Sequence, residues 1–225
     1  MLESTNPRNQ GLKRYIDHLF GHEDEILQKI LENSIAKGLP NIQIPVHQGR
    51  FIQMLAKVHQ VKRILELGTL GAYSTVWLAR ALPENGKLLS IESDTKHAII
   101  ARENIEMASL SHCVEVLMGN ALDLLPKMVR QKEDPFDLIF IDADKENYKF
   151  YLDWCLKLCR KGSLILIDNL IPRGEQIGFP GNKEAKYVYA FNQYLANHPL
   201  LETSLIPTLV DEEGRVDGLS ISQVV

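Results

Sequence analysis

The sequence predicts an α/β fold in which helices cover both faces of a mostly parallel, doubly wound sheet. Three features indicate it: short runs that are apolar almost throughout, helical stretches between those runs, and a glycine turn directly after the first run. Continuously apolar runs are typical of strands that are buried on both faces. Strands alternating with helices imply βαβ units. The chain has 225 residues and no Pro/Gly-rich linker, so one domain is expected over residues 1–225.

The first sixty residues are predicted to form an N-terminal helical extension, and residues 61–225 the α/β core. Apolar residues recur at helical spacing from Leu12 to Lys37, and Gly38-Leu39-Pro40 ends that region. A further helix is expected from Gln48 to Gln60.

The core is predicted to begin with five strands separated by four helices. The expected strands are Arg63–Leu67, Lys87–Ile91, Val114–Met118, Asp137–Ile141 and Ser163–Ile167. The helices between them are Ser74–Leu82, Thr95–Ala108, Ala121–Val129 and Asn147–Leu158. A last helix, Lys183–Asn197, precedes two strand candidates, Glu202–Ile206 and Leu219–Val224, with a turn at Asp211–Gly214. The short connection between these two strands favours an antiparallel edge.

Composition argues against several classes of protein. The net charge of −4 provides no basic stripe for nucleic acid. The longest apolar runs have the length of strands, which predicts no membrane span. The polar start, Met1 to Gln10, predicts no signal peptide. Three cysteines without a Cys-x-x-Cys pair suggest buried thiols in a reducing compartment, so a cytoplasmic protein is expected.

A glycine turn follows the first predicted strand, where ligands of open α/β sheets bind. Gly68 and Gly71 are expected to let the backbone approach a ligand. Ser74, at the start of the next helix, is either an N-cap or a ligand hydroxyl.

The residues around this turn favour S-adenosylmethionine over a dinucleotide. The dinucleotide fingerprint is Gly-x-Gly-x-x-Gly, but Leu70 stands where its second glycine would be. Glu66 would repel a pyrophosphate, whereas it suits the ammonium and sulfonium groups of S-adenosylmethionine. Glu92, after the second strand, can accept hydrogen bonds from ribose hydroxyls in either cofactor. An NAD-dependent oxidoreductase therefore remains the alternative.

Acidic residues follow the fourth and fifth predicted strands. Asp142, Asp168 and Asn169 would converge if those strands pair directly, and such oxygen ligands suit Mg²⁺ or a similar hard cation. The alternative is that these residues cap helices. Lys145 is a candidate base beside the cation, although spacing alone does not separate it from Lys149.

These motifs together resemble the caffeoyl-CoA and catechol O-methyltransferase family of class I, S-adenosylmethionine-dependent enzymes. They are Glu66-Leu-Gly-Thr-Leu-Gly-Ala-Tyr-Ser74, Phe140-Ile-Asp-Ala-Asp-Lys-Glu-Asn-Tyr148 and Asp168-Asn169, and the resemblance runs from about Ile44 to the C-terminus. It implies a Rossmann-like, seven-stranded sheet with an antiparallel final strand. It also implies a homodimer, a divalent cation (Mg²⁺, with Ca²⁺ or Mn²⁺ as alternatives) and a small phenolic substrate with vicinal hydroxyls.

The resemblance also implies a role for individual residues. The cation would be held by Asp142, Asp168 and Asn169, and Lys145 would be the catalytic base. Cofactor contacts are expected from Ile44, Glu66, Gly68, Thr69, Ser74, Glu92, Ala121 and Asp142. The segment Leu170–Glu175 would wall the acceptor pocket, and Asp211 or Glu212 would bind the second hydroxyl.

Two further possibilities remain open at the sequence level. One is a methyltransferase fold that binds S-adenosylmethionine without catalysis. The other is an amino-group methyltransferase acting on nucleic acid, which would need a Pro-Pro-aromatic element after the fourth strand and a basic face. The sequence has neither of these features.

Overall fold

The structure, a computed structural model, describes residues 11–172 and 181–225 and contains a seven-stranded sheet. The strand order is β3-β2-β1-β4-β5-β7-β6, and every neighbouring pair is parallel except those that involve β7. The strands are β1 Arg63–Leu67, β2 Lys87–Glu92, β3 Val114–Met118, β4 Phe136–Ile141, β5 Cys159–Ile167, β6 Leu201–Leu209 and β7 Val216–Val224. The predicted fold class, including the antiparallel final strand, is confirmed.

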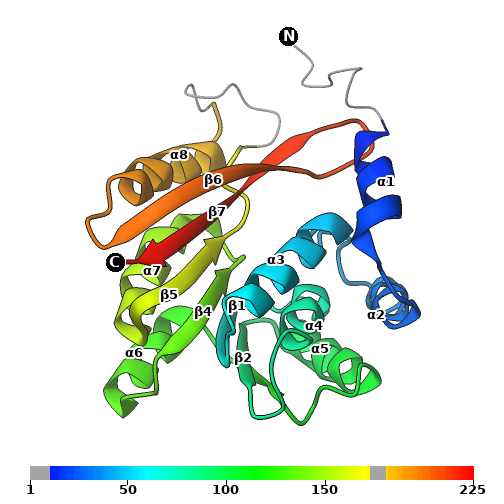
Figure 1. The fold of residues 1–225 in the computed structure, drawn as a ribbon, viewed down its shortest axis with the longest axis horizontal. Coiled ribbons are helices and arrows are strands. Elements are labelled where there is room, and N and C mark those ends of the chain that lie inside the picture. Colours follow the sequence, from blue (N-terminus) through cyan, green and yellow to red (C-terminus); the bar gives the residue numbers. More distant parts are fainter. Residues whose placement is uncertain (1–10, 173–180) are drawn as a thin grey trace.

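Helices cover both faces of the sheet, as Figure 1 shows. Helices α2 to α5 bury apolar side chains against one face, and α6 to α8 do so against the other. The helices are α1 Leu12–Ile16, α2 Glu25–Ala36, α3 Val46–Val58, α4 Tyr73–Ala79, α5 Thr95–Met107, α6 Ala121–Gln131, α7 Tyr148–Cys155 and α8 Lys183–Ala196. No helix in the described ranges is long and apolar enough to cross a membrane.

The region predicted as helical from Leu12 to Lys37 is helical for most of its length, but the chain breaks between α1 and α2, which was not predicted. A π-helical turn, Asp17–Gly21, ends at His22, whose φ is 54°. Asp24 then caps α2 by accepting a hydrogen bond from the backbone N–H of Leu27 at 3.0 Å. A new helix therefore begins after this N-cap. The apolar residues keep helical spacing on both sides of the break, so the spacing did not indicate it.

Strand order places the candidate site. The chain runs outward from β1 to β3 on one side and from β4 to β5 on the other, so a crevice opens beyond the carboxyl ends of β1 and β4. β4 and β5 pair directly, with Ile141 beside Ile167. The residues that follow these strands, Asp142 and Asp168, are therefore neighbours, as predicted.

The antiparallel hairpin of β6 and β7 carries its turn away from the crevice to the N-terminal helix (Figure 1). The Gly11 N–H donates to the Glu212 carbonyl at 3.4 Å, and the Arg14 guanidinium lies 3.4 Å from the Glu212 carboxylate. The start of β7 nevertheless lies beside the end of β5, because the two strands run in opposite directions.

Candidate active site

A cavity of about 800 Å³ opens at the carboxyl ends of β1, β2 and β4. This volume lies within the usual range for small-molecule sites. Most of the predicted site residues line it: Ile44, Gly68, Thr69, Ser74, Glu92, Ala121, Asp142, Lys145 and Asn169. Glu66 and Asp168 are buried beside the cavity but are not part of its lining.

The glycine turn is held tightly against protein. A Cβ at Gly68, whose φ is +94°, would lie 2.0 Å from the Asp142 carbonyl oxygen, and one at Gly71 would lie 2.3 Å from the Ser34 hydroxyl. Both glycines line the cavity and each also makes room for protein, so their approach to a ligand stays a prediction. Leu70 and Ala72 also have positive φ, of 48° and 65°. Such strain in non-glycine residues is typical of functional turns.

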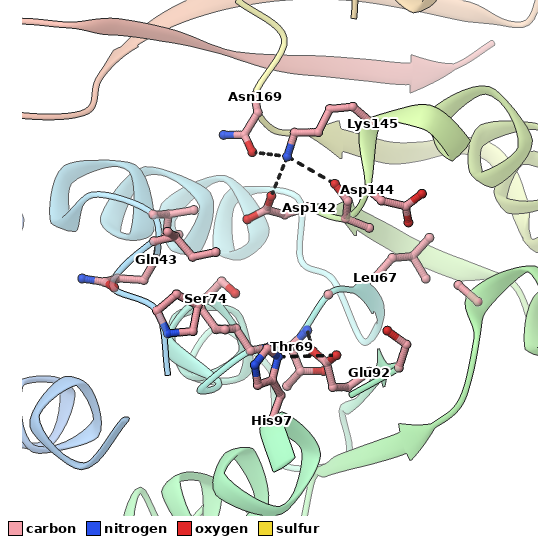
Figure 2. A pocket seen from close by; sticks show the side chains of 18 of the residues that line it. Gln43, Leu67, Thr69, Ser74, Glu92, His97, Asp142, Asp144, Lys145 and Asn169 are labelled. Atoms are coloured by element: carbon pink, nitrogen blue, oxygen red, sulfur yellow. Dashed lines mark hydrogen bonds and ion pairs between the residues drawn. The ribbon is translucent and has the colours of Figure 1, made fainter. Parts of the chain in front are cut away.

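Glu92 fastens this turn to the end of β2. One carboxylate oxygen accepts hydrogen bonds from the N–H groups of Thr69 at 3.1 Å and Leu70 at 2.9 Å. The other accepts from the Asp94 N–H at 2.9 Å and lies 3.8 Å from the His97 ring nitrogen. Figure 2 shows Glu92 and His97 side by side in the cavity wall, at the end that the sequence assigned to the cofactor.

Glu66 is fully buried behind the cavity wall. Its carboxylate accepts hydrogen bonds from three hydroxyls, of Ser74 at 2.6 Å, Thr75 at 2.5 Å and Ser90 at 2.7 Å. Burial raises the pKa of Glu66 from 4.5 to about 7, although the hydroxyls oppose the change. Glu66 thus reaches the cavity through Ser74 and not by direct contact. Ser74 is not an N-cap, since Ala72 holds that position in α4.

Lys145 lies among the predicted cation ligands. Its ammonium donates to the Asn169 side-chain oxygen at 2.7 Å and to the Ala143 carbonyl at 3.2 Å, and it lies 3.9 Å from an Asp142 carboxylate oxygen (Figure 2). Lys149 instead pairs with Asp153 at 2.6 Å, away from the cavity lining. The structure therefore selects Lys145 as the lysine of the cavity.

Asp168 brings a second carboxylate to this end, and unlike Asp142 it is buried. It is 3% exposed, and its Oδ1 atom has no hydrogen-bond partner among the described residues. Burial raises the pKa of Asp168, and repulsion from Asp142 and Asp217 raises it further. A buried oxygen without a donor, in a group of carboxylates that repel one another, is the environment that a cation would stabilise.

The donor set fits a hard cation. Asp142, Asp168 and Asn169 offer two carboxylates and an amide, which suit Mg²⁺ or a similar ion. None of the three caps a helix in the described chain; Asp144 and Asn147 precede the helical turns that follow β4. No group of three His, Cys, Asp or Glu side chains that could hold a metal occurs within residues 11–172 and 181–225. The amide of Asn169 is therefore essential to the candidate set.

The sequence predictions missed some lining residues and misplaced others. Asp217 and His97 line the cavity, as do Tyr151, Asn182 and Val188. Within the predicted acceptor wall, Ile171 and Pro172 line the cavity, and residues 173–175 lie outside the described chain. Asp211 and Glu212 do not line it; they pair with Arg215 and Arg14 near the hairpin turn. The motif Val216-Asp-Gly218 was the available signal for Asp217.

Comparison with known proteins is consistent with this geometry. The O-methyltransferase family model matches residues 18–212. A catechol O-methyltransferase from Niastella koreensis is 39% identical over 216 residues, which cover 96% of this chain and 97% of the relative. A caffeoyl-CoA O-methyltransferase from Populus kitakamiensis is 31% identical over 211 residues, covering 88% and 90%. The solved O-methyltransferase from Bacillus cereus, in complex with SAH, superposes with a TM-score of 0.90 at 37% identity, covering 97% and 99%.

Proposed function

The chain belongs to the O-methyltransferase family, and we propose that it transfers a methyl group from S-adenosylmethionine to one hydroxyl of a vicinal-diol phenol, with a divalent cation. The observation that carries the proposal is a single cavity with two chemically different ends. Glu92 and the glycine turn form one end, and Lys145 lies with Asp142 and Asn169 at the other. The SAH complex of the Bacillus cereus relative supports the cofactor, and the catechol enzyme from Niastella koreensis supports the acceptor class.

The first end suits an adenosine ligand with a positively charged tail. Ile44 and Ala121 provide apolar surface for an adenine, and the Glu92 carboxylate lies where ribose hydroxyls would donate to it. Glu66, behind Ser74, provides negative charge for the ammonium and sulfonium groups. Three hydroxyl donors keep that carboxylate oriented before any ligand arrives.

The second end suits the acceptor. A phenol has a pKa of about 10, so only roughly one molecule in a thousand is ionised at neutral pH. A cation bound by Asp142, Asp168 and Asn169 would lower the pKa of a hydroxyl placed against it. Lys145, as general base, would take the hydroxyl proton on Nζ in its neutral amine form, because the ammonium form has no free electron pair. Asn169 and Asp142 hold Nζ in the cavity, where a neighbouring hydroxyl could reach it.

The main contribution of the protein is positioning. Positive charge on the donor and negative charge on the acceptor cancel during methyl transfer, so little new charge requires stabilisation. The glycine turn is held in place by Glu92, which accepts hydrogen bonds from two of its N–H groups, and the backbone of Asp142 lies against Gly68. A cofactor end that is held in place and a charged acceptor end suit an in-line transfer.

The experiment is to assay methyl transfer to a catechol, with a monophenol as the control acceptor, in Mg²⁺ and in a chelating buffer. The wild type should methylate the catechol only with the metal, and Asp168→Ala should remove that activity. Calorimetric binding of S-adenosylmethionine by the same variant should remain nearly intact, because Asp168 does not line the cofactor end.

Asp153→Ala is the matched control, since it removes a carboxylate from α7 outside the cavity. Full activity of Asp168→Ala, or of the wild type in chelator, would contradict the metal-dependent mechanism. Cofactor binding without turnover on any vicinal diol would favour the non-catalytic alternative.

A further inference from the structure

The side-chain amide of Asn169 has an orientation that its neighbours determine. Its oxygen accepts from the Lys145 ammonium at 2.7 Å, and its nitrogen donates to an Asp217 carboxylate oxygen at 3.0 Å. Lysine offers only donors and a carboxylate offers only acceptors, so the reversed amide would lose both hydrogen bonds. The amide oxygen, the atom that a cation can bind, therefore faces Lys145 and the cavity.

Asp217 is itself held firmly. It is 2% exposed, and its other carboxylate oxygen accepts from the N–H groups of Gly218 at 2.7 Å and Ile171 at 3.2 Å. The Leu170 N–H donates to the Gly218 carbonyl at 2.9 Å, which ties the same segment to β7. The Asp217 carboxylate is thus fixed on one side by backbone donors and on the other by Asn169.

We propose that Asp217 is a positioning residue that sets which atom of Asn169 faces the cavity. This inference rests on the proposed cation site. Asp217 would not touch the cation; it would act through Asn169, whose backbone φ of 60° is one that asparagine tolerates. Residues that orient metal ligands in this way typically change metal affinity by 10- to 100-fold when they are replaced.

The reversed direction of β7 makes this contact possible. Because β7 is antiparallel to β5, its first residues lie beside the last residues of β5, with Ser220 opposite Ile167. A parallel strand would bring its own carboxyl end to this place. The antiparallel strand therefore brings a buried acceptor to the amide that follows β5.

The test is the isosteric substitution Asp217→Asn, with Mn²⁺ binding measured by electron paramagnetic resonance without substrate. The new side chain keeps an oxygen toward the N–H groups of Ile171 and Gly218, so its NH₂ group faces Asn169. Asn169 then either keeps its oxygen toward Lys145 and loses its acceptor at residue 217, or turns its NH₂ toward Lys145 and the cavity; in both cases its oxygen is no longer held in place by two partners. Mn²⁺ affinity should fall by about 10- to 100-fold, while the melting temperature changes little.

Two further variants separate orientation from charge. Asp144→Asn removes one negative charge from the same cavity without touching Asn169, and it should weaken Mn²⁺ binding much less. The exchange Asn169→Asp with Asp217→Asn should restore the affinity. In that pair the new amide donates to one carboxylate oxygen of residue 169, and the other oxygen faces the cavity.

The Mn²⁺ affinities of the wild type and the variants test the role of Asp217 and the cation site separately. Wild-type affinity in Asp217→Asn overturns the inference, and so does an equal loss in Asp144→Asn. An exchange variant that stays weak also overturns it. A wild type that binds no Mn²⁺ overturns the cation site itself, which is the failure of the proposed function and is seen before any variant is compared.

Discussion

The buried carboxyl of Glu66 leads to a prediction about stability. Its pKa is raised from 4.5 to about 7, chiefly by burial. Below pH 4.5 both the folded and the unfolded chain hold the proton; between pH 4.5 and 7 only the folded chain holds it; above pH 7 neither does. The free energy of unfolding must therefore fall as the pH rises through this window.

The size of the effect follows from the two pKa values. One pKa unit corresponds to about 1.4 kcal/mol, so Glu66 should cost about 3 kcal/mol across the whole window and about 2.5 kcal/mol between pH 5 and 8. Glu66→Gln, which cannot ionise, removes that cost. The Ser74 hydroxyl can accept from the new amide, so the local hydrogen bonds survive.

The assay is urea unfolding of the wild type and Glu66→Gln at pH 5 and pH 8, followed by tryptophan fluorescence. From pH 5 to pH 8, the free energy of unfolding of Glu66→Gln should rise by about 2.5 kcal/mol relative to that of the wild type. Glu115→Gln, which removes an exposed carboxylate from β3, is measured as a control. A pH dependence of the free energy of unfolding that both variants share is then not assigned to Glu66. A difference that stays constant between the two pH values would refute the reasoning.

Three more predictions test the cofactor end of the cavity. In the wild type, the affinity for S-adenosylmethionine should rise as the pH passes through about 7 and Glu66 ionises. The affinity of Glu66→Gln should not change in this way. Calorimetry at pH 6 and pH 8 measures both proteins, and an equal change of affinity in the two would show that Glu66 plays no part. Glu92→Ala should weaken the cofactor by more than about tenfold, a loss of roughly 1.4 kcal/mol, and an unchanged affinity would remove Glu92 from the site. Gly71→Ala should lower the free energy of unfolding by about 1–3 kcal/mol, because its Cβ would lie 2.3 Å from the Ser34 hydroxyl. Adding Ser34→Ala should recover part of that loss, and a Gly71→Ala protein as stable as the wild type would contradict the packing argument.

Strand positions were largely predictable from local pattern. β1 and β3 have the predicted bounds, and β2 and β4 differ by one residue, because strands buried on both faces are apolar throughout. The break at His22 was not predictable from apolar spacing, since the residues on either side keep helical periodicity. The N-cap at Asp24 outweighed that periodicity.

Part of the candidate site was also predictable from the sequence, and part was not. The turn at Gly68, the carboxylate at Glu92 and the pair Asp142 and Asp168 follow strand ends, and strand ends can be identified in the sequence. Spacing alone did not separate Lys145 from Lys149, and the structure separates them by the partners that each one meets. The position of Glu66 in the motif predicted a direct contact with the cofactor. In the structure, three hydroxyls surround its carboxylate instead.

The sequence by itself determined the order of strands and helices, the glycine turn and the kinds of donor at the strand ends. These features depend on backbone conformation and on side chains a few residues apart. Only the tertiary structure decided that Asp217 meets Asn169, that Gly71 makes room for Ser34, and that Glu66 is held behind Ser74. The first two contacts join distant segments, and the contact of Asp217 depends on the reversed direction of β7. Glu66 and Ser74 lie eight residues apart, and their contact depends on the packing around the glycine turn. Local periodicity carries no information about strand direction or about packing.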